Sequence, residues 1–281
     1  MRRKTKLWLA AAAILFGVGC MIFGGVMTVL EWDLTRLSTV RYETNEYVLI
    51  EPYTDIAVDT VTADVLLLPA EGTETRVVCR EAENVKHTVA VSDGRLTVTV
   101  KDTRRWYEYI GVSFEMPRVT VYLPQGAYGA VSVSAATGDL CVEALTADTL
   151  ALSVTTGKVS VQDVACAGDA SVHVTTGDVT VRNGRFGSLS SRGTTGDLML
   201  QNTLAEKTLS VRRETGDVTL DGCDAAQILV QTTTGDIAGT LLSEKVFHAK
   251  TTTGRGSVPQ STAGGPCELS ATTGDITVEL R

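Results

Sequence analysis

The sequence predicts an all-β protein: a β-solenoid (β-helix) of about eight coils of 19–20 residues, with an irregular β cap at its N-terminal end and one transmembrane helix before the cap. Three observations predict this architecture. A Thr-Gly phrase recurs eight times at an almost constant spacing, apolar and polar residues alternate around each copy, and an uncharged apolar stretch lies near the N-terminus. The predicted parts are a basic cytoplasmic tail (1–6), a transmembrane helix (7–30), a linker (31–44), the N-terminal β cap (45–126) and the repeat solenoid (127–281).

The uncharged stretch covers residues 7–30, a run of 24 residues. As a helix it would be about 36 Å long, which is enough to cross a hydrocarbon core of about 30 Å. The residues before it include four basic ones and no acidic one: Arg2, Arg3, Lys4 and Lys6. By the positive-inside rule the N-terminus is then cytoplasmic and the chain after the helix is extracytoplasmic. We therefore expect a single-pass protein of a cell membrane.

Two other interpretations of this stretch stay open, a cleaved signal peptide and a lipoprotein signal. The apolar core of a signal peptide has about 7–15 residues, so this stretch is longer than usual. A lipoprotein would be modified at Cys20, but Gly17 stands where the lipoprotein pattern has a bulky aliphatic residue. Apolar residues also continue after Cys20. These features favour an uncleaved anchor.

The charge balance argues against a nucleic-acid partner. The formal net charge is −8, and because residues 1–30 hold four basic groups, the remaining chain has 21 basic groups against 33 acidic ones. A surface that binds phosphates needs the opposite balance. The chain has three His and no CxxC or other zinc-type spacing. We therefore expect neither a cofactor nor a metal site.

An odd number of cysteines follows the apolar stretch, so they cannot all pair with one another. They are Cys79, Cys141, Cys166, Cys223 and Cys267. Their wide spacing favours isolated small residues on strands and loops, with one disulfide between neighbouring coils as the alternative.

The strongest signal is the repeated phrase, whose usual form is TTGD. Its glycines are 19 or 20 residues apart: Gly138, Gly157, Gly177, Gly196, Gly216, Gly235, Gly254 and Gly274. Val172, Val174, Val179 and Val181 show the alternation on either side of one copy, a pattern that places every second side chain in a core. Each unit is too short for a βαβ crossover and cannot bury its apolar face alone, so the units must stack.

Each residue of the phrase has a predicted structural role. Glycine at the bend permits positive φ, and the threonines before the glycines would align as a ladder along the stack. The aspartates after the glycines would accept backbone N–H groups of their own turn. A column of aspartates could instead bind calcium. Lys158 and Arg255 interrupt that column, however, and would neutralise their neighbours without a metal.

Residues 34–126 are also strand-like, although their period is irregular. Residues 61–65 resemble a degenerate copy of the phrase, so we expect this region to begin the same β body and to cap its first coil. An insert in this region concentrates aromatic residues and is a candidate partner-binding spot: Arg105, Trp106, Tyr107 and Tyr109. The alternative is that these rings cover the open end of the solenoid or lie in a loop.

The strand at residues 276–280 is expected to form the terminal coil. Its outer edge would then be free to pair with a partner or a second copy. Glu279 and Arg281 could instead be enough to blunt that edge, which is the interpretation that we favour.

The segment VTVYLPQGAYGAVSVSAATGDL (119–140), followed by TTGD-type repeats, resembles a bacterial family of β-strand-repeat adhesin-type proteins catalogued as domain of unknown function 4097. The resemblance covers about residues 45–281. It implies a bacterial envelope protein with a β-helix-like body, often tethered by one N-terminal helix, and it supplies no catalytic residues. Some members resemble accessory proteins of cell-envelope stress responses.

Three hypotheses of function follow. The first is a non-enzymatic, membrane-anchored adhesin or envelope-binding module whose partner is a cell-surface glycan or an envelope protein. The second is a regulatory or scaffolding protein of the envelope stress response. The third and most remote is a polysaccharide-cleaving β-helix enzyme, for which Asp139, Lys158 and Asp178 in successive coils are the candidate residues.

Overall fold

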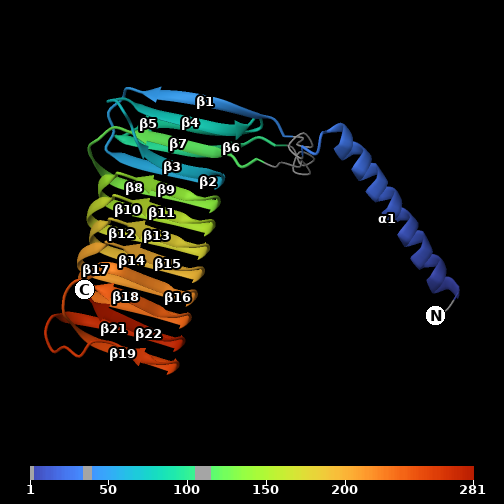
Figure 1. Ribbon diagram of the computed structural model, residues 1–281. Helices are drawn as coiled ribbons and strands as arrows, with labels where there is room; N and C mark the ends of the chain where they lie inside the picture. Colours follow the sequence, from blue (N-terminus) through green and yellow to red (C-terminus); the bar gives the residue numbers. More distant parts are fainter. Residues whose placement is uncertain (1–2, 34–39, 105–114) are drawn as a thin grey trace. The chain divides into compact units, whose positions relative to one another are not determined.

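The computed structural model describes residues 3–33, 40–104 and 115–281, which divide into two units (Figure 1). The first unit contains α1 (Arg3–Val29). Within this helix the stretch Trp8–Val29 has a mean hydropathy of 2.3. The helix is long and apolar enough to cross a membrane, and a signal sequence would have the same properties. The second unit, Tyr42–Thr103 with Met116–Arg281, holds all of the β-strands.

The repeat region is a β-solenoid of about eight coils, as the sequence predicts. In a typical coil a long strand ends at the repeated phrase, and a short strand follows the bend. The strands are β8 (Ala127–Thr137), β9 (Leu140–Glu143), β10 (Thr146–Thr156), β11 (Val159–Gln162), β12 (Ala165–Thr176), β13 (Val179–Arg182), β14 (Arg185–Thr195), β15 (Leu198–Gln201), β16 (Leu204–Thr215), β17 (Val218–Thr234), β18 (Ile237–Leu241), β19 (Lys245–Thr253), β20 (Gly256–Ser257), β21 (Gly265–Thr273) and β22 (Ile276–Leu280).

Neighbouring coils pair in parallel with equivalent residues in register. Leu152 of β10, for example, is aligned with Val133 of β8 and Val172 of β12. Every second residue along these strands is buried, so apolar columns fill the interior of the coils. Because each side chain in a column packs on its equivalent in the next coil, one hydrophobic core runs through the β unit.

The glycine bends explain why the phrase cannot change at its third position. The eight glycines have φ between 127° and 149°, a region that side chains rarely adopt. A Cβ atom on Gly157 would lie 2.0 Å from the carbonyl oxygen of Gly138 in the preceding coil. Both the backbone conformation and the closeness of the adjacent coil therefore require glycine.

The aspartates of the phrase bridge coils, so the prediction that they bind within their own turn is wrong. Lys158 N–H donates to Asp139 Oδ1 at 2.8 Å, and Asp217 N–H donates to Asp197 Oδ1 at 2.9 Å. The physical reason is that the carboxylate lies beside the next coil, whose amide at this position points toward it. Each such aspartate therefore fastens one coil to the next.

A second column of bends follows the short strands of the coils. Asp163, Asn183 and Asn202 have φ of 54°, 54° and 49°, in the left-handed region that Asn and Asp tolerate. Asn183 Nδ2 donates to Asp163 Oδ1 at 2.8 Å, and Asn202 Nδ2 donates to Asn183 Oδ1 at 3.3 Å. These side chains form a second ladder along the stack.

The cap begins with a coil that matches the repeats. Its strands are β2 (Asp55–Thr62) and β3 (Asp64–Pro69), and Thr62 is aligned with Thr137 of the next coil. Ala63 occupies the place of the motif glycine, since a Cβ on Gly138 would lie 2.1 Å from its carbonyl oxygen. Unlike the eight glycines, Ala63 does not have a positive φ, so alanine is tolerated in this first coil. The degenerate phrase at residues 61–65 thus occupies the motif position of a true coil.

The remaining cap strands cover that coil. They are β1 (Tyr42–Leu49), β4 (Thr75–Ala82), β5 (Val85–Ser92), β6 (Arg95–Asp102) and β7 (Arg118–Leu123). β6 and β7 pair in parallel with β2 and β3. β4 is antiparallel to both β7 and β1, and β5 is antiparallel to β6, so hairpins replace coils at this end of the β unit (Figure 1).

At the other end the coils do not follow sequence order. β21 and β22 lie between β17–β18 and β19–β20, with Gly235 N–H bonded to Thr273 O at 3.0 Å and Gly274 N–H bonded to Thr253 O at 2.9 Å (Figure 1). The prediction that residues 276–280 form the terminal coil is therefore wrong. Cys267, Leu269 and Ala271 of β21 are buried, whereas Thr251 of β19 is aligned with Ala271, so the coil whose inner column is wholly apolar takes the interior place.

Candidate functional site

A groove of about 730 Å³ runs along the coils at the start of the long strands. In several coils the register shifts at this place, for instance between Ala147 and Leu150 and between Cys166 and Asp169. Such bulges bend the strand and interrupt its regular alternation. The groove lies beside these register shifts, at the start of the long strands.

The floor of the groove is one column of mostly small side chains. Its members are aligned in successive coils and are each at most 5% exposed: Ala147, Cys166, Phe186, Ala205 and Ala225. With coils about 4.8 Å apart, this column is about 19 Å long. These side chains are almost fully covered, so the apolar surface open to a ligand comes from other lining residues, such as the exposed Ala167 and the half-buried Leu204.

Charged residues line the rim and one end. Asp148 and Glu206 are exposed on the rim, and Arg185 lies between their coils. At the end of the groove Lys245 Nζ lies 2.7 Å from Asp224 Oδ1, and its side chain is 6% exposed. Burial opposes ionisation of Asp224, but hydrogen bonds from Lys245 and Ser243 outweigh it and hold the pKa of Asp224 below its ordinary value. The groove therefore ends at a fixed ion pair.

The buried cysteines do not provide a reactive thiolate. Burial raises the pKa of Cys79 and Cys267 to about 12, and that of Cys223 to about 11. Cys166, in the groove floor, donates to Asp148 O at 3.2 Å, and burial again raises its pKa. All of the cysteines are free thiols in the structure. The residues described thus include no disulfide, which favours isolated cysteines over a bridge between coils.

The candidate residues from the sequence lie in different places. Arg105, Trp106, Tyr107 and Tyr109 fall outside the described residues. The candidates for polymer cleavage, Asp139, Lys158 and Asp178, do occupy successive coils, with Lys158 Nζ 3.8 Å from Asp178 Oδ2. They lie at the glycine bends and outside the groove lining, and the carboxylate of Asp139 already holds a coil-to-coil bond.

The groove was not anticipated from the sequence, although a signal for it exists. Its floor residues precede the motif glycines by ten or eleven positions, as Ala147 precedes Gly157 and Cys166 precedes Gly177. A column of mostly small residues at the repeat period, followed in most coils by a charged or small exposed residue, marks the groove.

Comparison with known proteins agrees with this fold. The family model for Toastrack DUF4097 matches residues 53–206 and 186–281. A crystal structure from Bacteroides fragilis, described as a "putative adhesin", is similar at 16% identity with a TM-score of 0.52, over 86% of this chain and 97% of that one. A structure from Parabacteroides distasonis with the same description has 14% identity and a TM-score of 0.46, over 87% and 98%. No curated protein matches. Because the family model covers well over half of the sequence, the chain belongs to the DUF4097 (Toastrack) family.

Proposed function

We propose that this protein is a non-enzymatic, membrane-anchored binding module of the cell envelope, with its β unit on the extracytoplasmic side. The observation that carries the proposal is the groove, which extends along consecutive coils and has an apolar floor with a charged rim. The apolar helix α1 and the basic residues before its apolar stretch support the anchor and its orientation.

The groove suits an extended, amphipathic polymer such as a cell-surface glycan. Ala167 and Leu204 in the groove lining can contact the C–H faces of sugar rings. Asp148, Arg185 and Glu206 on the rim can hydrogen-bond to hydroxyl groups. An extended peptide fits less well. Peptides that add to a sheet need an unpaired strand edge, and the floor strands are paired on both sides.

The second candidate is a regulatory or scaffolding protein of the envelope, and a different feature favours it. Among the described strands β19 pairs with β21 alone, which leaves its other edge open for a partner protein. Lys250 on this strand is exposed and tends to blunt such an edge.

Photocrosslinking in native membranes separates these proposals. The full-length protein would carry benzoylphenylalanine at Ala167 on the groove rim, at Ser153 as an exposed control elsewhere on the preceding coil, or at Lys250 on β19. We expect glycan to be recovered from the Ala167 variant and not from the Ser153 variant. Equal yields at Ala167 and Ser153 would contradict binding in the groove. A single protein recovered only at Lys250 would favour the scaffold.

A further inference from the structure

The N-terminal cap encloses three side chains of types that bind metal ions: Cys79 and Glu81 of β4, and His87 of β5. Their ligand atoms all lie within 4.8 Å of one another. Cys79 and Glu81 have no exposed surface, and His87 is 3% exposed. This group lies away from the groove, so it is independent of the site proposed above.

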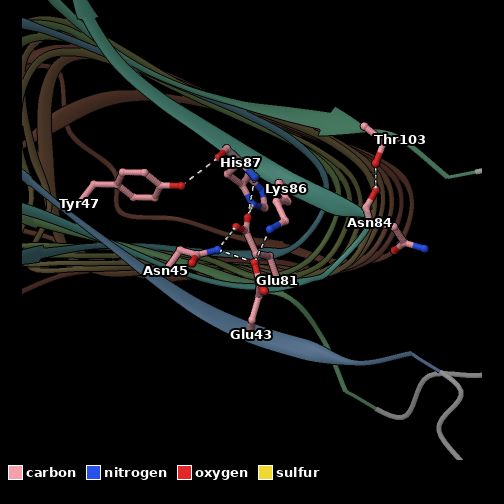
Figure 2. Close-up of polar contacts among 8 residues, drawn as sticks. All are labelled: Glu43, Asn45, Tyr47, Glu81, Asn84, Lys86, His87 and Thr103. Carbon is pink, nitrogen blue, oxygen red and sulfur yellow. Dashed lines mark hydrogen bonds and ion pairs between the residues drawn. The ribbon is translucent and has the colours of Figure 1, made fainter.

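The local fold brings these residues together. Cys79 and Glu81 are two positions apart on β4, so their side chains point to the same inner face of the strand. Ala82 and Val85 close the β4–β5 hairpin, which directs His87 back toward Glu81. Figure 2 shows the result, in which the ring of His87 faces the carboxylate of Glu81.

The carboxylate of Glu81 is held on both oxygens. Oε2 accepts the backbone N–H of His87 at 2.5 Å and lies 2.7 Å from Nδ1 of the same residue. Oε1 accepts from Asn45 Nδ2 of β1 at 2.7 Å. These contacts orient the side chain, but all the donors except the imidazole are neutral groups.

Among the ion pairs recorded for the described residues, Glu81 contacts His87 and no lysine or arginine directly. Lys86 binds Glu43 at 2.6 Å, and Asn45 Nδ2 donates to both Glu43 and Glu81, so the direct contact of Lys86 is with Glu43 (Figure 2). A buried carboxylate is costly unless a cation accompanies it. A metal ion bound by Cys79, Glu81 and His87 would supply such a cation.

The outer contacts of the group match those of a metal site. His87 Nε2 lies 3.2 Å from Thr60 Oγ1 of β2, which fixes the ring and leaves Nδ1 directed at the group. Ligating histidines commonly have their second nitrogen held in this way, and ligating carboxylates are likewise hydrogen-bonded. Asn45 serves that purpose for Glu81.

We propose that Cys79, Glu81 and His87 bind one zinc ion, or a transition metal of similar preference, in the core of the cap. Sulfur, nitrogen and carboxylate oxygen together suit zinc, whereas magnesium and calcium prefer oxygen ligands alone. Because the ligands and their supporting residues come from β1, β2, β4 and β5, the metal would tie these strands together. The burial of all three side chains leaves a substrate no access to the metal, so its role would be to hold the strands together, with three protein ligands in place of the usual four of structural zinc sites.

Metal analysis of the full-length protein, purified in detergent without chelators, tests the proposal. We expect about one zinc ion per chain by elemental analysis. After removal of zinc, cobalt should bind with a thiolate-to-cobalt charge-transfer absorption band. A protein that contains no stoichiometric metal and gives no such band with cobalt would overturn the proposal, and this measurement needs no variant.

A matched pair of variants tests whether Cys79 is the sulfur ligand of the metal. Cys79→Ser should weaken zinc binding by about tenfold or more and abolish the cobalt band, because a hydroxyl is a poor replacement for a thiolate ligand. Cys267→Ser, an equally buried cysteine in β21, should retain both. Chelation should lower the denaturation midpoint of the wild type and of Cys267→Ser, but not that of Cys79→Ser. Unchanged metal binding in Cys79→Ser would exclude the site and leave a His87–Glu81 ion pair.

Discussion

The N-terminal cap and the repeat coils both bury polar side chains, but they surround them differently. In the cap, Glu81 and His87 meet partners from β1 and β2, namely Asn45 and Thr60. In the coils, Arg213 of β16 is 1% exposed and donates to Ser191 Oγ at 3.1 Å, while among the described residues its Nε and Nη1 atoms have no partner. Hairpins bring non-equivalent strands together, whereas a parallel coil offers each residue mainly its own column. A non-repeating polar residue is therefore easier to satisfy in the cap.

The preceding coil makes room for Arg213 because it has smaller side chains at the neighbouring positions. Gly193 is the register partner of Arg213, and it follows Val174 in the same column. A Cβ on Gly193 would lie 1.6 Å from Arg213 Nη1, so the guanidinium occupies the space that a side chain would fill. Ser191 likewise replaces the apolar residues of its column, such as Val172. Regular stacking thus tolerates one large polar residue when its neighbours are small.

The strongest test of regular stacking is Gly177→Ala. Gly177 has φ of 141°, and a Cβ there would lie 2.0 Å from the carbonyl oxygen of Gly157. We expect a loss of at least about 3 kcal/mol of unfolding free energy, since backbone strain and a steric clash combine. Chemical denaturation followed by circular dichroism measures this. Gly72→Ala in the cap, where a Cβ has open space, should change the midpoint little. Equal losses in the two variants would contradict the role assigned to the bend.

Arg213→Met tests whether the buried arginine lowers the stability of the coils. Burial lowers the pKa of Arg213, although Asp178 and Asp197 act against this shift. Replacing an incompletely paired buried charge by an apolar side chain of similar length should leave stability unchanged or increase it by about 1–4 kcal/mol. The neighbouring Arg212→Met, at an exposed position, should stay within about 0.5 kcal/mol of the wild type. A large loss for Arg213→Met would show that the guanidinium has a partner that stabilises it.

The difference between repeating coils and a non-repeating cap also explains which features could be predicted from the sequence. The glycine positions and the apolar columns follow from a strict period, because each coil repeats the environment of the last. The order of the last coils does not follow from it, since the inner columns of β19 and β21 differ by little more than Thr251 against Ala271. The group around Glu81 was missed because its ligands are spaced unlike a zinc motif and meet through a hairpin. Its partners Asn45 and Thr60 come from strands far away in the sequence.

The smallest expected effect concerns the aspartates that bridge coils. In Asp197→Ala the backbone N–H of Asp217 loses its carboxylate acceptor at 2.9 Å, but the site is exposed and water can replace that acceptor. We therefore expect a loss of about 1 kcal/mol, compared with almost none for Asp148→Ala on the groove rim, again by chemical denaturation. Adding calcium should not shift the midpoint of either variant or of the wild type. A calcium-dependent shift that disappears in Asp197→Ala would instead identify the column as a cation site. Each bridging aspartate then contributes little to the unfolding free energy alone, but nearly every coil has one, so their contributions to stability add up along the stack.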